Sequence, residues 1–218
     1  NTVPEQKVRF AVNKIRKGQA EGRLLEILEH SPEECQPACP HFGVCGGCTY
    51  QNLPYEKQVE MKEAQIHAMM DAAVDGDYIW EGVKESPVRE AYRNKMEFSF
   101  GDEYKDGPLA LGMHKRGSFH DIVNVTECKI VDEDFRRIIK AVLEFATDTG
   151  LPYYHRMRHT GFFRHLLVRK AVRTGEILID LVTTSEAQLD EARLVEKLTG
   201  LSYDGKLAGI LHTTNNSL

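Results

Sequence analysis

The sequence contains no long hydrophobic run and no excess of positive charge. None of its 218 residues lies in a stretch approaching the roughly 18 consecutive apolar residues of a membrane-spanning helix, and no charged-then-apolar secretion signal follows Asn1. Its 28 Lys and Arg residues are outnumbered by 33 Asp and Glu, for a net charge of −5. A membrane protein and a uniformly basic nucleic-acid binder are therefore excluded. We expect a cytoplasmic protein, excised from a longer one, whose 41% hydrophobic residues suffice for a core.

Cysteine is scarce, but its distribution is uneven. Three of the five cysteines, Cys39, Cys45 and Cys48, fall within ten residues. In a cytosolic protein such clustering favours a metal site over a disulfide framework, and the intervening glycines let the backbone fold tightly enough for the sulfurs to converge. Cys128, between a predicted strand and a predicted helix N-terminus, can supply a fourth ligand, because the helix dipole favours its negative charge.

Three interpretations of these cysteines stay open: a structural zinc, an iron–sulfur cluster and ordinary buried thiols. Zinc sites with four thiolates usually use paired C-x2-C knuckles, whereas this sequence has one such pair beside a five-residue gap, which favours an iron–sulfur cluster. Chance alone rarely places three cysteines so close together, which disfavours ordinary thiols. His41 would be a ligand in a zinc site and a packing or hydrogen-bonding residue beside a cluster. Cys35 is interpreted as a spare thiol.

Alternating apolar and polar residues predict strands. A first hairpin, Val8–Val12 with Gly22–Leu28, has the character of the end of a small β-barrel, because two strands alone are marginal in water. The other expected strands cover residues 96–100, 109–113, 122–125, 165–173, 176–183 and 207–211.

Three helices are expected, each with a start signal. Pro54 begins an amphipathic helix over 54–73, with Tyr55, Val59, Ile66, Met70 and Ala73 near helical spacing. Asp132 caps a helix that ends at Gly150. Ser185 caps the third, which ends at Gly200 and turns inward Leu189, Ala192, Val195 and Leu198. Because the order strand, strand, helix occurs twice, we predict an α+β fold with an antiparallel sheet and covering helices.

A basic segment, residues 153–173, contains no Asp or Glu. Such a one-signed stretch in an acidic chain is a candidate for contact with phosphates, and its aromatic residues suit stacking on splayed bases. The alternative is a solvated basic face above buried aromatic side chains. Its charged and aromatic residues are Tyr153, Tyr154, His155, Arg156, Arg158, His159, Phe162, Phe163, Arg164, His165, Arg169, Lys170 and Arg173.

Arg93 and Lys95 open a predicted strand whose alternate residues Met96 and Phe98 face the core. Their charges therefore point toward solvent or RNA. On sequence alone they could equally protect a sheet edge from pairing.

Several motifs together resemble one protein family. Cys39-Pro-His-Phe-Gly-Val-Cys45-Gly-Gly-Cys48, followed by Gln51, Tyr55, Gln58 and Lys62, resembles the RNA (uracil-5)-methyltransferases, especially the 23S ribosomal RNA enzymes. Residues 91–99, the Glu127-Cys128 turn and residues 161–169 are similar to further landmarks of that family, in the same order. Residues 22–28 resemble the end of its TRAM β-barrel, so the likeness covers nearly the whole chain.

The resemblance implies a function and a division into domains. It implies a 4Fe-4S cluster held by Cys39, Cys45, Cys48 and Cys128, with a structural or RNA-orienting role. It also implies an S-adenosylmethionine-binding domain of Rossmann type that carries the catalytic residues and lies outside this chain, so that the fragment itself should be inactive. Residues 1–30 would be the remnant of the TRAM barrel, 31–206 the central iron–sulfur RNA-binding domain, and 207–218 the start of the connection to the missing domain.

The implied partner is RNA, by resemblance 23S ribosomal RNA, bound by a monomer away from any membrane. The alternatives are a transfer RNA (uracil-5)-methyltransferase and a zinc-stabilised nucleic-acid-binding module without enzymatic relatives. An electron-transfer or radical S-adenosylmethionine protein is disfavoured, because four ligands would close the cluster. The expected RNA-binding residues are Arg93, Lys95, Arg156, Arg158, Arg164, His165 and Arg169.

Overall fold

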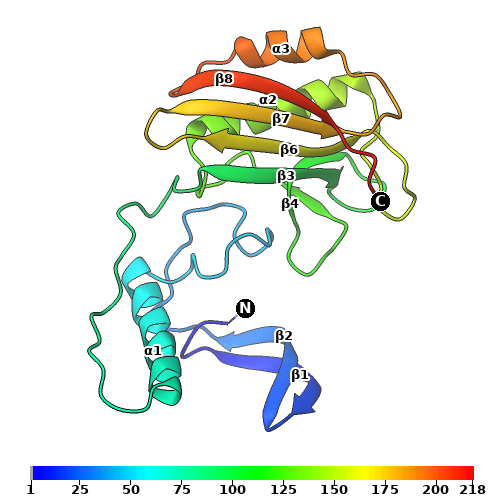
Figure 1. Cartoon of the computed structure of the whole chain (residues 1–218). Helices are drawn as coiled ribbons and strands as arrows, with labels where there is room; N and C mark the ends of the chain where they lie inside the picture. Colours follow the sequence, from blue (N-terminus) through cyan, green and yellow to red (C-terminus); the bar gives the residue numbers. More distant parts are fainter. Residues whose placement is uncertain (1) are drawn as a thin grey trace. The chain divides into compact units, whose positions relative to one another are not determined.

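The structure is a computed structural model that describes residues 2–218. It divides into two compact units, each described by itself: Asn1–Ala38 with Cys48–Pro87, and Cys39–Gly47 with Val88–Leu218. Helices and strands occur together, as the predicted α+β class requires (Figure 1). Among the described residues, no helix has the length and apolar character needed to cross a bilayer.

The first unit begins with a two-stranded antiparallel hairpin, β1 (Lys7–Arg16) and β2 (Gln19–Glu29). Its two-residue turn places both Lys17 and Gly18 at positive φ, 47° and 78°, which matches the right-handed twist of the strands. The predicted hairpin is confirmed. Its apolar residues Phe10, Ile15 and Leu25 are exposed, because a two-stranded ribbon cannot cover its own faces.

Helix α1 (Tyr55–Ala73) begins one residue later than expected, since Pro54 is its N-cap residue. The predicted helix is confirmed, but no residue of α1 is buried, and Ile66 and Met70 of its apolar spacing are exposed. A segment after the helix covers part of it through Trp80, whose Nε1 donates to Glu63 Oε1 over 2.8 Å. This single segment buries far less of the helix surface than a sheet would, so the apolar residues of α1 stay exposed.

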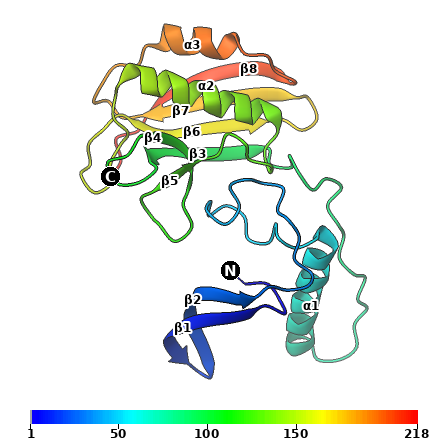
Figure 2. The ribbon, with the colours of Figure 1, turned by 180° about the vertical axis from the view of Figure 1, so that it is seen from behind.

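The second unit contains a six-stranded sheet in the order β5-β4-β3-β6-β7-β8 (Figures 1 and 2). Each strand expected from the sequence is present, but β6 begins and ends before the predicted 165–173, and β3 and β8 are longer than predicted. All neighbours are antiparallel except β7 and β8, which are parallel because α3 connects them as a crossover. The predicted purely antiparallel sheet is thus corrected at one pair. The strands are β3 (Lys95–Asp102), β4 (Leu109–His114), β5 (Ile122–Asn124), β6 (Phe163–Lys170), β7 (Glu176–Thr183) and β8 (Lys206–Thr214).

Helices α2 (Glu133–Thr149) and α3 (Glu191–Thr199) cover this sheet, and Figure 2 shows α2 crossing one face of it. The predicted start and end of α2 are confirmed: Asp132 accepts a hydrogen bond from the Phe135 amide, and Gly150 is left-handed with φ 68°. The core between helices and sheet contains fully buried Phe98, Phe135 and Leu166.

The predicted start of α3 is wrong. Asp190, not Ser185, caps the helix, by accepting from the Arg193 amide over 3.0 Å. Leu198 is buried as predicted, whereas Ala192 and Val195 are exposed and Leu194 is buried in their place.

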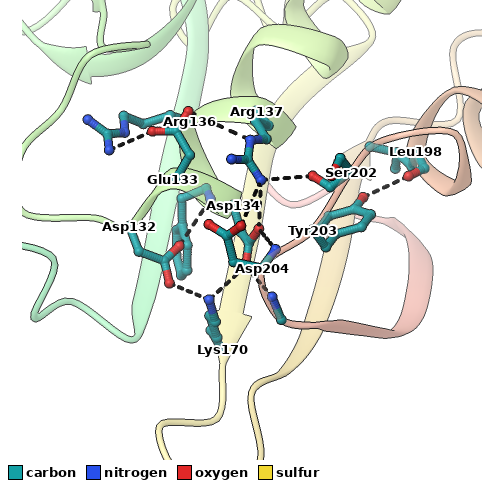
Figure 3. Close-up of polar contacts among 12 residues, drawn as sticks. Asp132, Glu133, Asp134, Arg136, Arg137, Lys170, Leu198, Ser202, Tyr203 and Asp204 are labelled. Carbon is teal, nitrogen blue, oxygen red and sulfur yellow. Dashed lines mark hydrogen bonds and ion pairs between the residues drawn. The ribbon is translucent and has the colours of Figure 1, made fainter.

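A buried carboxylate joins α2 to two distant parts of the second unit (Figure 3). The side chain of Asp134 is fully buried and accepts hydrogen bonds from the amides of Asp204 and Gly205, at 2.7 and 2.9 Å. Lys170 at the end of β6 contacts both Asp134 and Asp132, each at 2.6 Å. Lys170 is therefore an internal ion-pair residue rather than a free charge of the basic segment.

Candidate functional site

The sheet cavity, a hollow of about 370 Å³ in the second unit, lies on the face of the sheet away from the buried core. Ser99 on β3 and His165 on β6 are opposite each other in the strand register and line it. They alternate with Phe98 and Leu166, which are fully buried, so their side chains point to the other face. The remaining walls come from the loop after β4 and from residues 153–158.

The structure brings four of the seven expected RNA-binding residues to this cavity: Arg156, Arg158, Arg164 and His165 all line it. The other three, Arg93, Lys95 and Arg169, are exposed residues outside the lining.

Lys95 and Arg169 are nevertheless direct partners in the β3–β6 register, so they lie side by side on the face of the sheet that carries the cavity. Lys95 also pairs with Glu97, at 3.7 Å. Lys95 and Arg169 fit the alternative that strand charges protect a sheet edge better than Arg156 and Arg158 do, because a carboxylate already accompanies Lys95.

A tight turn presents Arg156, Met157 and Arg158. The His155 amide donates to the Thr160 carbonyl over 2.8 Å, and His155 Nδ1 stands 3.3 Å from the amides of Met157 and Arg158. The backbone of the turn is thus satisfied internally. The four side chains between its ends, those of Arg156, Met157, Arg158 and His159, are exposed to solvent.

The charges around the cavity are unequally paired. Arg164 lies 4.1 Å from the centre of the Tyr154 ring and donates to the carbonyls of Asn215 and Ser217, at 3.0 and 2.8 Å. Arg164 is thus a positioning residue for this wall. Arg156 and Arg158, in contrast, form no ion pair with any residue of the described chain.

The carboxylates of Asp102, Asp106 and Asp121 also line the cavity, and those of Asp102 and Asp121 have a partner. Asp102 accepts from the Asp106 amide over 2.9 Å, and Asp121 lies 3.8 Å from Lys115. Among residues 2–218, the cations that line the cavity exposed and without an ion pair are therefore Lys105, Arg156 and Arg158.

Two histidines of the cavity are held neutral at pH 7. Burial lowers the pKa of His165 below its ordinary value; Glu97 opposes this, while Arg156 and Arg164 reinforce it. Burial, with Arg156, likewise lowers the pKa of His114. Buried His114 Nδ1 has no hydrogen-bond partner among the described residues. Neutral imidazoles can both donate and accept, so this wall suits an uncharged polar ligand.

Sequence reasoning missed the apolar rim of the cavity. Phe119 and Met157 line it although their side chains are 89% and 73% exposed. Neither belongs to a periodic pattern; the available signal was a lone aromatic residue in a loop that begins with Lys115-Arg116-Gly117.

The cysteine loop is fixed to the second unit through its backbone. Cys45 forms an antiparallel bridge with Lys115, just beyond β4. The amide of Gly46 donates to the His114 carbonyl over 2.9 Å, and that of Arg116 donates to the Val44 carbonyl over 2.7 Å. A side chain at Gly46 would come within 3.0 Å of the same His114 oxygen, which is one reason for glycine there.

The predicted ligands differ in their surroundings. Cys39 and Cys128 are buried, and Cys45 Sγ accepts from the Gly47 amide over 3.3 Å. Cys48 belongs to the first unit, where its Sγ accepts from Gln51 Nε2 over 3.2 Å. Within residues 2–218, no three His, Cys, Asp or Glu side chains form a group that could hold a metal ion. The predicted ligand set therefore stays a prediction. Exposed Cys35 fits the interpretation of a spare thiol.

No protein-family profile matches the chain. Individual proteins do. The chain is 50% identical over 217 residues to a protein of Clostridium acetobutylicum named as an uncharacterized RNA methyltransferase, a match that covers 99% of this chain and 47% of that protein. It is 42% identical over 212 residues to a protein of the same description from Caldanaerobacter subterraneus, covering 97% of this chain and 47% of that relative.

A solved structure shares the fold. The tRNA (uracil-54, C5)-methyltransferase of Pyrococcus abyssi, in complex with S-adenosyl-L-homocysteine, superposes with a TM-score of 0.68 at 21% identity, over 99% of this chain and 46% of that one. The chain belongs to the family of these two relatives, the RNA methyltransferases. It spans about half the length of the curated relatives it matches.

Proposed function

We propose that the chain is the RNA-holding part of an S-adenosylmethionine-dependent RNA (uracil-5)-methyltransferase. The observation that carries RNA binding is the pair Arg156 and Arg158, which stand exposed and without an ion pair among residues 2–218 at the rim of the sheet cavity. The relatives' names and the fold of the solved methyltransferase support the proposal. In this proposal residues 1–30 are a TRAM remnant, 31–206 the RNA-binding domain, and 207–218 lead toward the catalytic domain.

The chemistry of the intact enzyme would take place outside this chain. S-adenosylmethionine supplies the methyl group, and a thiolate elsewhere in the enzyme would activate C5 of an unstacked uridine by adding to C6. We assign no catalytic residue here and expect the chain alone to be inactive. Its own residues bind and orient the RNA.

The proposed substrate is 23S ribosomal RNA, on the likeness of the cysteine loop and the TRAM remnant. Transfer RNA is the alternative, and the solved structure that shares the fold is that of a transfer RNA enzyme. Mapping of 5-methyluridines in a strain lacking the full-length protein decides between them. Loss of the modification from 23S RNA supports the first choice, and loss from transfer RNA contradicts it.

Salt dependence tests RNA binding. Each phosphate contact to single-stranded RNA contributes about 0.7 to the slope of log K against log salt, so the double variant Arg156→Ala/Arg158→Ala should lower that slope by about 1.4 and weaken binding. Fluorescence anisotropy of labelled RNA over a salt series measures both quantities.

A matched control removes two exposed lysines outside the cavity lining, Lys140 on α2 and Lys206 on β8. The variant Lys140→Ala/Lys206→Ala makes the same change in net charge and should keep the wild-type slope. Equal losses in the two variants would show that binding follows net charge and not this site.

We further propose that Cys39, Cys45, Cys48 and Cys128 hold a 4Fe-4S cluster with a structural role. The proposal is supported by the chemistry of the donors, since all four are thiols and the sulfurs of Cys45 and Cys48 accept N–H hydrogen bonds of the kind that tune metal-bound sulfur. A zinc site in a nucleic-acid-binding module is the competing possibility. Anaerobic purification with iron and zinc analysis and visible absorption separates them: a brown protein with about four irons per chain is expected.

Loss of one ligand should release the cluster and lower the melting temperature, because the cluster would tie separate segments of the chain together. Cys45→Ser is the test and Cys35→Ser the control, since exposed Cys35 is outside the proposed set. Iron content and melting temperature are the measurements. Full iron content and an unchanged melting temperature in Cys45→Ser would contradict the proposal, as would stoichiometric zinc in the wild type.

A further inference from the structure

The sheet cavity has the dimensions of a small-ligand site. Its volume, about 370 Å³, is at the lower end of the range of roughly 300–1,000 Å³ that small-molecule pockets occupy. A base with its sugar is a ligand of this size, whereas a paired RNA helix cannot enter. The cavity therefore excludes duplex RNA and admits a single unstacked nucleotide.

The rim of the cavity exposes two apolar side chains where solvent should disfavour them. Phe119 comes from the loop between β4 and β5, and Met157 from the turn before β6, so separate segments place them at one opening. They are 89% and 73% exposed. An aromatic ring and a thioether at an opening can receive the flat face of a base, and stacking of this kind recurs in single-stranded RNA recognition.

Two positively charged side chains lie next to Met157. Arg156 and Arg158 flank Met157 in the sequence, and all three are exposed on the same turn. A ligand whose apolar part contacts Met157 therefore carries its anionic group within reach of a guanidinium. A base joined to a backbone phosphate combines an apolar face with an anionic group. A lipid chain has no polar groups that could bind to the polar lining of the cavity.

Uncharged polar groups line part of the cavity, beside the carboxylates of Asp102 and Asp121. Ser99 Oγ stands 3.4 Å from His165 Nδ1, and both residues line the hollow. His114 and Tyr153 lie on the lining as well, and the buried Nδ1 of His114 is without a partner among the described residues. Hydroxyl and neutral imidazole groups can donate to and accept from a base.

We infer that the sheet cavity binds one unstacked nucleotide of single-stranded RNA, its base between Phe119 and Met157 and its phosphate at Arg156 and Arg158. This deepens the proposed function and rests on it.

The test separates base recognition from phosphate binding. The whole chain is titrated with a short oligouridylate, with an abasic ribose-phosphate strand of equal length, and with a duplex of the same length. The wild type should bind the oligouridylate about 10-fold more tightly than the abasic strand, because stacking is worth about 1–3 kcal/mol per base. The duplex should bind no better than the abasic strand.

Two pairs of variants complete the test. Phe119→Ala/Met157→Ala should lose the preference for bases while keeping the abasic affinity and the salt slope. Val172→Ala/Leu211→Ala, which shortens two exposed apolar side chains outside the cavity lining, should keep the preference. Melting curves of all variants show that each is folded.

The outcomes distinguish this inference from the proposed function. If Phe119→Ala/Met157→Ala retains the full preference for bases, or if duplex RNA binds as tightly as the single strand, the pocket is overturned and RNA binding stands. If the wild-type chain binds none of the three strands, both RNA binding and the pocket are overturned.

Discussion

At Gly161 the backbone leaves no room for a side chain. Its φ is +116°, and a Cβ there would lie 2.0 Å from the carbonyl oxygen of Tyr153. Its own amide donates to Glu186 Oε2 over 2.7 Å, and its carbonyl accepts from Thr184 Oγ1 over 2.7 Å. The glycine therefore fixes where the chain enters β6 and, with it, one wall of the sheet cavity.

We predict that Gly161→Ala lowers the free energy of unfolding by about 3 kcal/mol, since backbone strain and overpacking each cost about 1–3 kcal/mol. Denaturant unfolding followed by circular dichroism measures the change. Gly150→Ala is the control, because Gly150 has φ +68° but nothing within 4 Å of an added Cβ, so strain alone should cost about 1 kcal/mol. Equal losses in both variants would show that the contact with Tyr153 is relieved by a small shift.

Single residues also show what a pattern in the sequence can and cannot predict. The composition of residues 153–173 indicated a cationic surface, and the structure places Arg156 and Arg158 on it. The same pattern included Lys170, whose charge is taken up by Asp132 and Asp134. Asp134 is far from the segment in sequence, so no local window could have revealed this pairing.

At the scale of elements, α3 shows that the orientation of a helix on the sheet decides which of its residues are buried. Successive helical residues are separated by about 100°, so the same apolar residues can face the core or the solvent according to how the helix is oriented on the sheet. The crossover from β7 to β8 sets this orientation. Two salt bridges, Arg193 with Asp148 and Lys197 with Glu144, then join α3 to α2 along the exposed side.

Two substitutions in α3 should therefore differ sharply. Leu198→Ala should lower the free energy of unfolding by about 2–5 kcal/mol, because a fully buried side chain leaves a cavity. Val195→Ala should change it by less than about 0.5 kcal/mol, because Val195 is 42% exposed. Urea unfolding of the two variants measures both values. A larger loss at Val195 than at Leu198 would contradict the buried face seen in the structure.

At the scale of the whole molecule, buried titratable groups determine how stability depends on pH. Burial lowers the pKa of His114 and His165 below 6.5, so the folded state resists their protonation. For Asp134 burial alone would raise the pKa, but Lys170 and the amides of Asp204 and Gly205 outweigh it, and the pKa lies below 3.8. Burial would also raise the pKa of Glu34, but hydrogen bonds with Gln6 and His30 outweigh it and lower this pKa to about 2.

All four groups have a lower pKa in the folded state, so the stability they contribute is present above the unfolded pKa and lost as pH falls. We predict a first decline in the free energy of unfolding below pH 6.5, from the histidines, and a second below about 4.5, from Glu34 and then Asp134. Denaturant unfolding across this pH range measures it.

A matched pair of variants assigns the first decline. His165→Asn, which is neutral at every pH, should reduce it, and His114→Asn should reduce it as well. A wild-type stability that is level between pH 7 and 5 would contradict the prediction.

Short-range patterns in the chain were enough to specify most elements and the family. Alternation indicated the strands, Asp132 and Gly150 marked the bounds of α2, and the cysteine loop carried the resemblance, because turn chemistry, caps and periodicity act over a few neighbouring residues. Folding in three dimensions was needed to establish that β8 pairs parallel with β7, that Lys170 is neutralised, and that Phe119 and Met157 meet at one cavity. Each of these depends on segments brought together by packing of the sheet and helices, and the chain records no local signal of such long-range contacts.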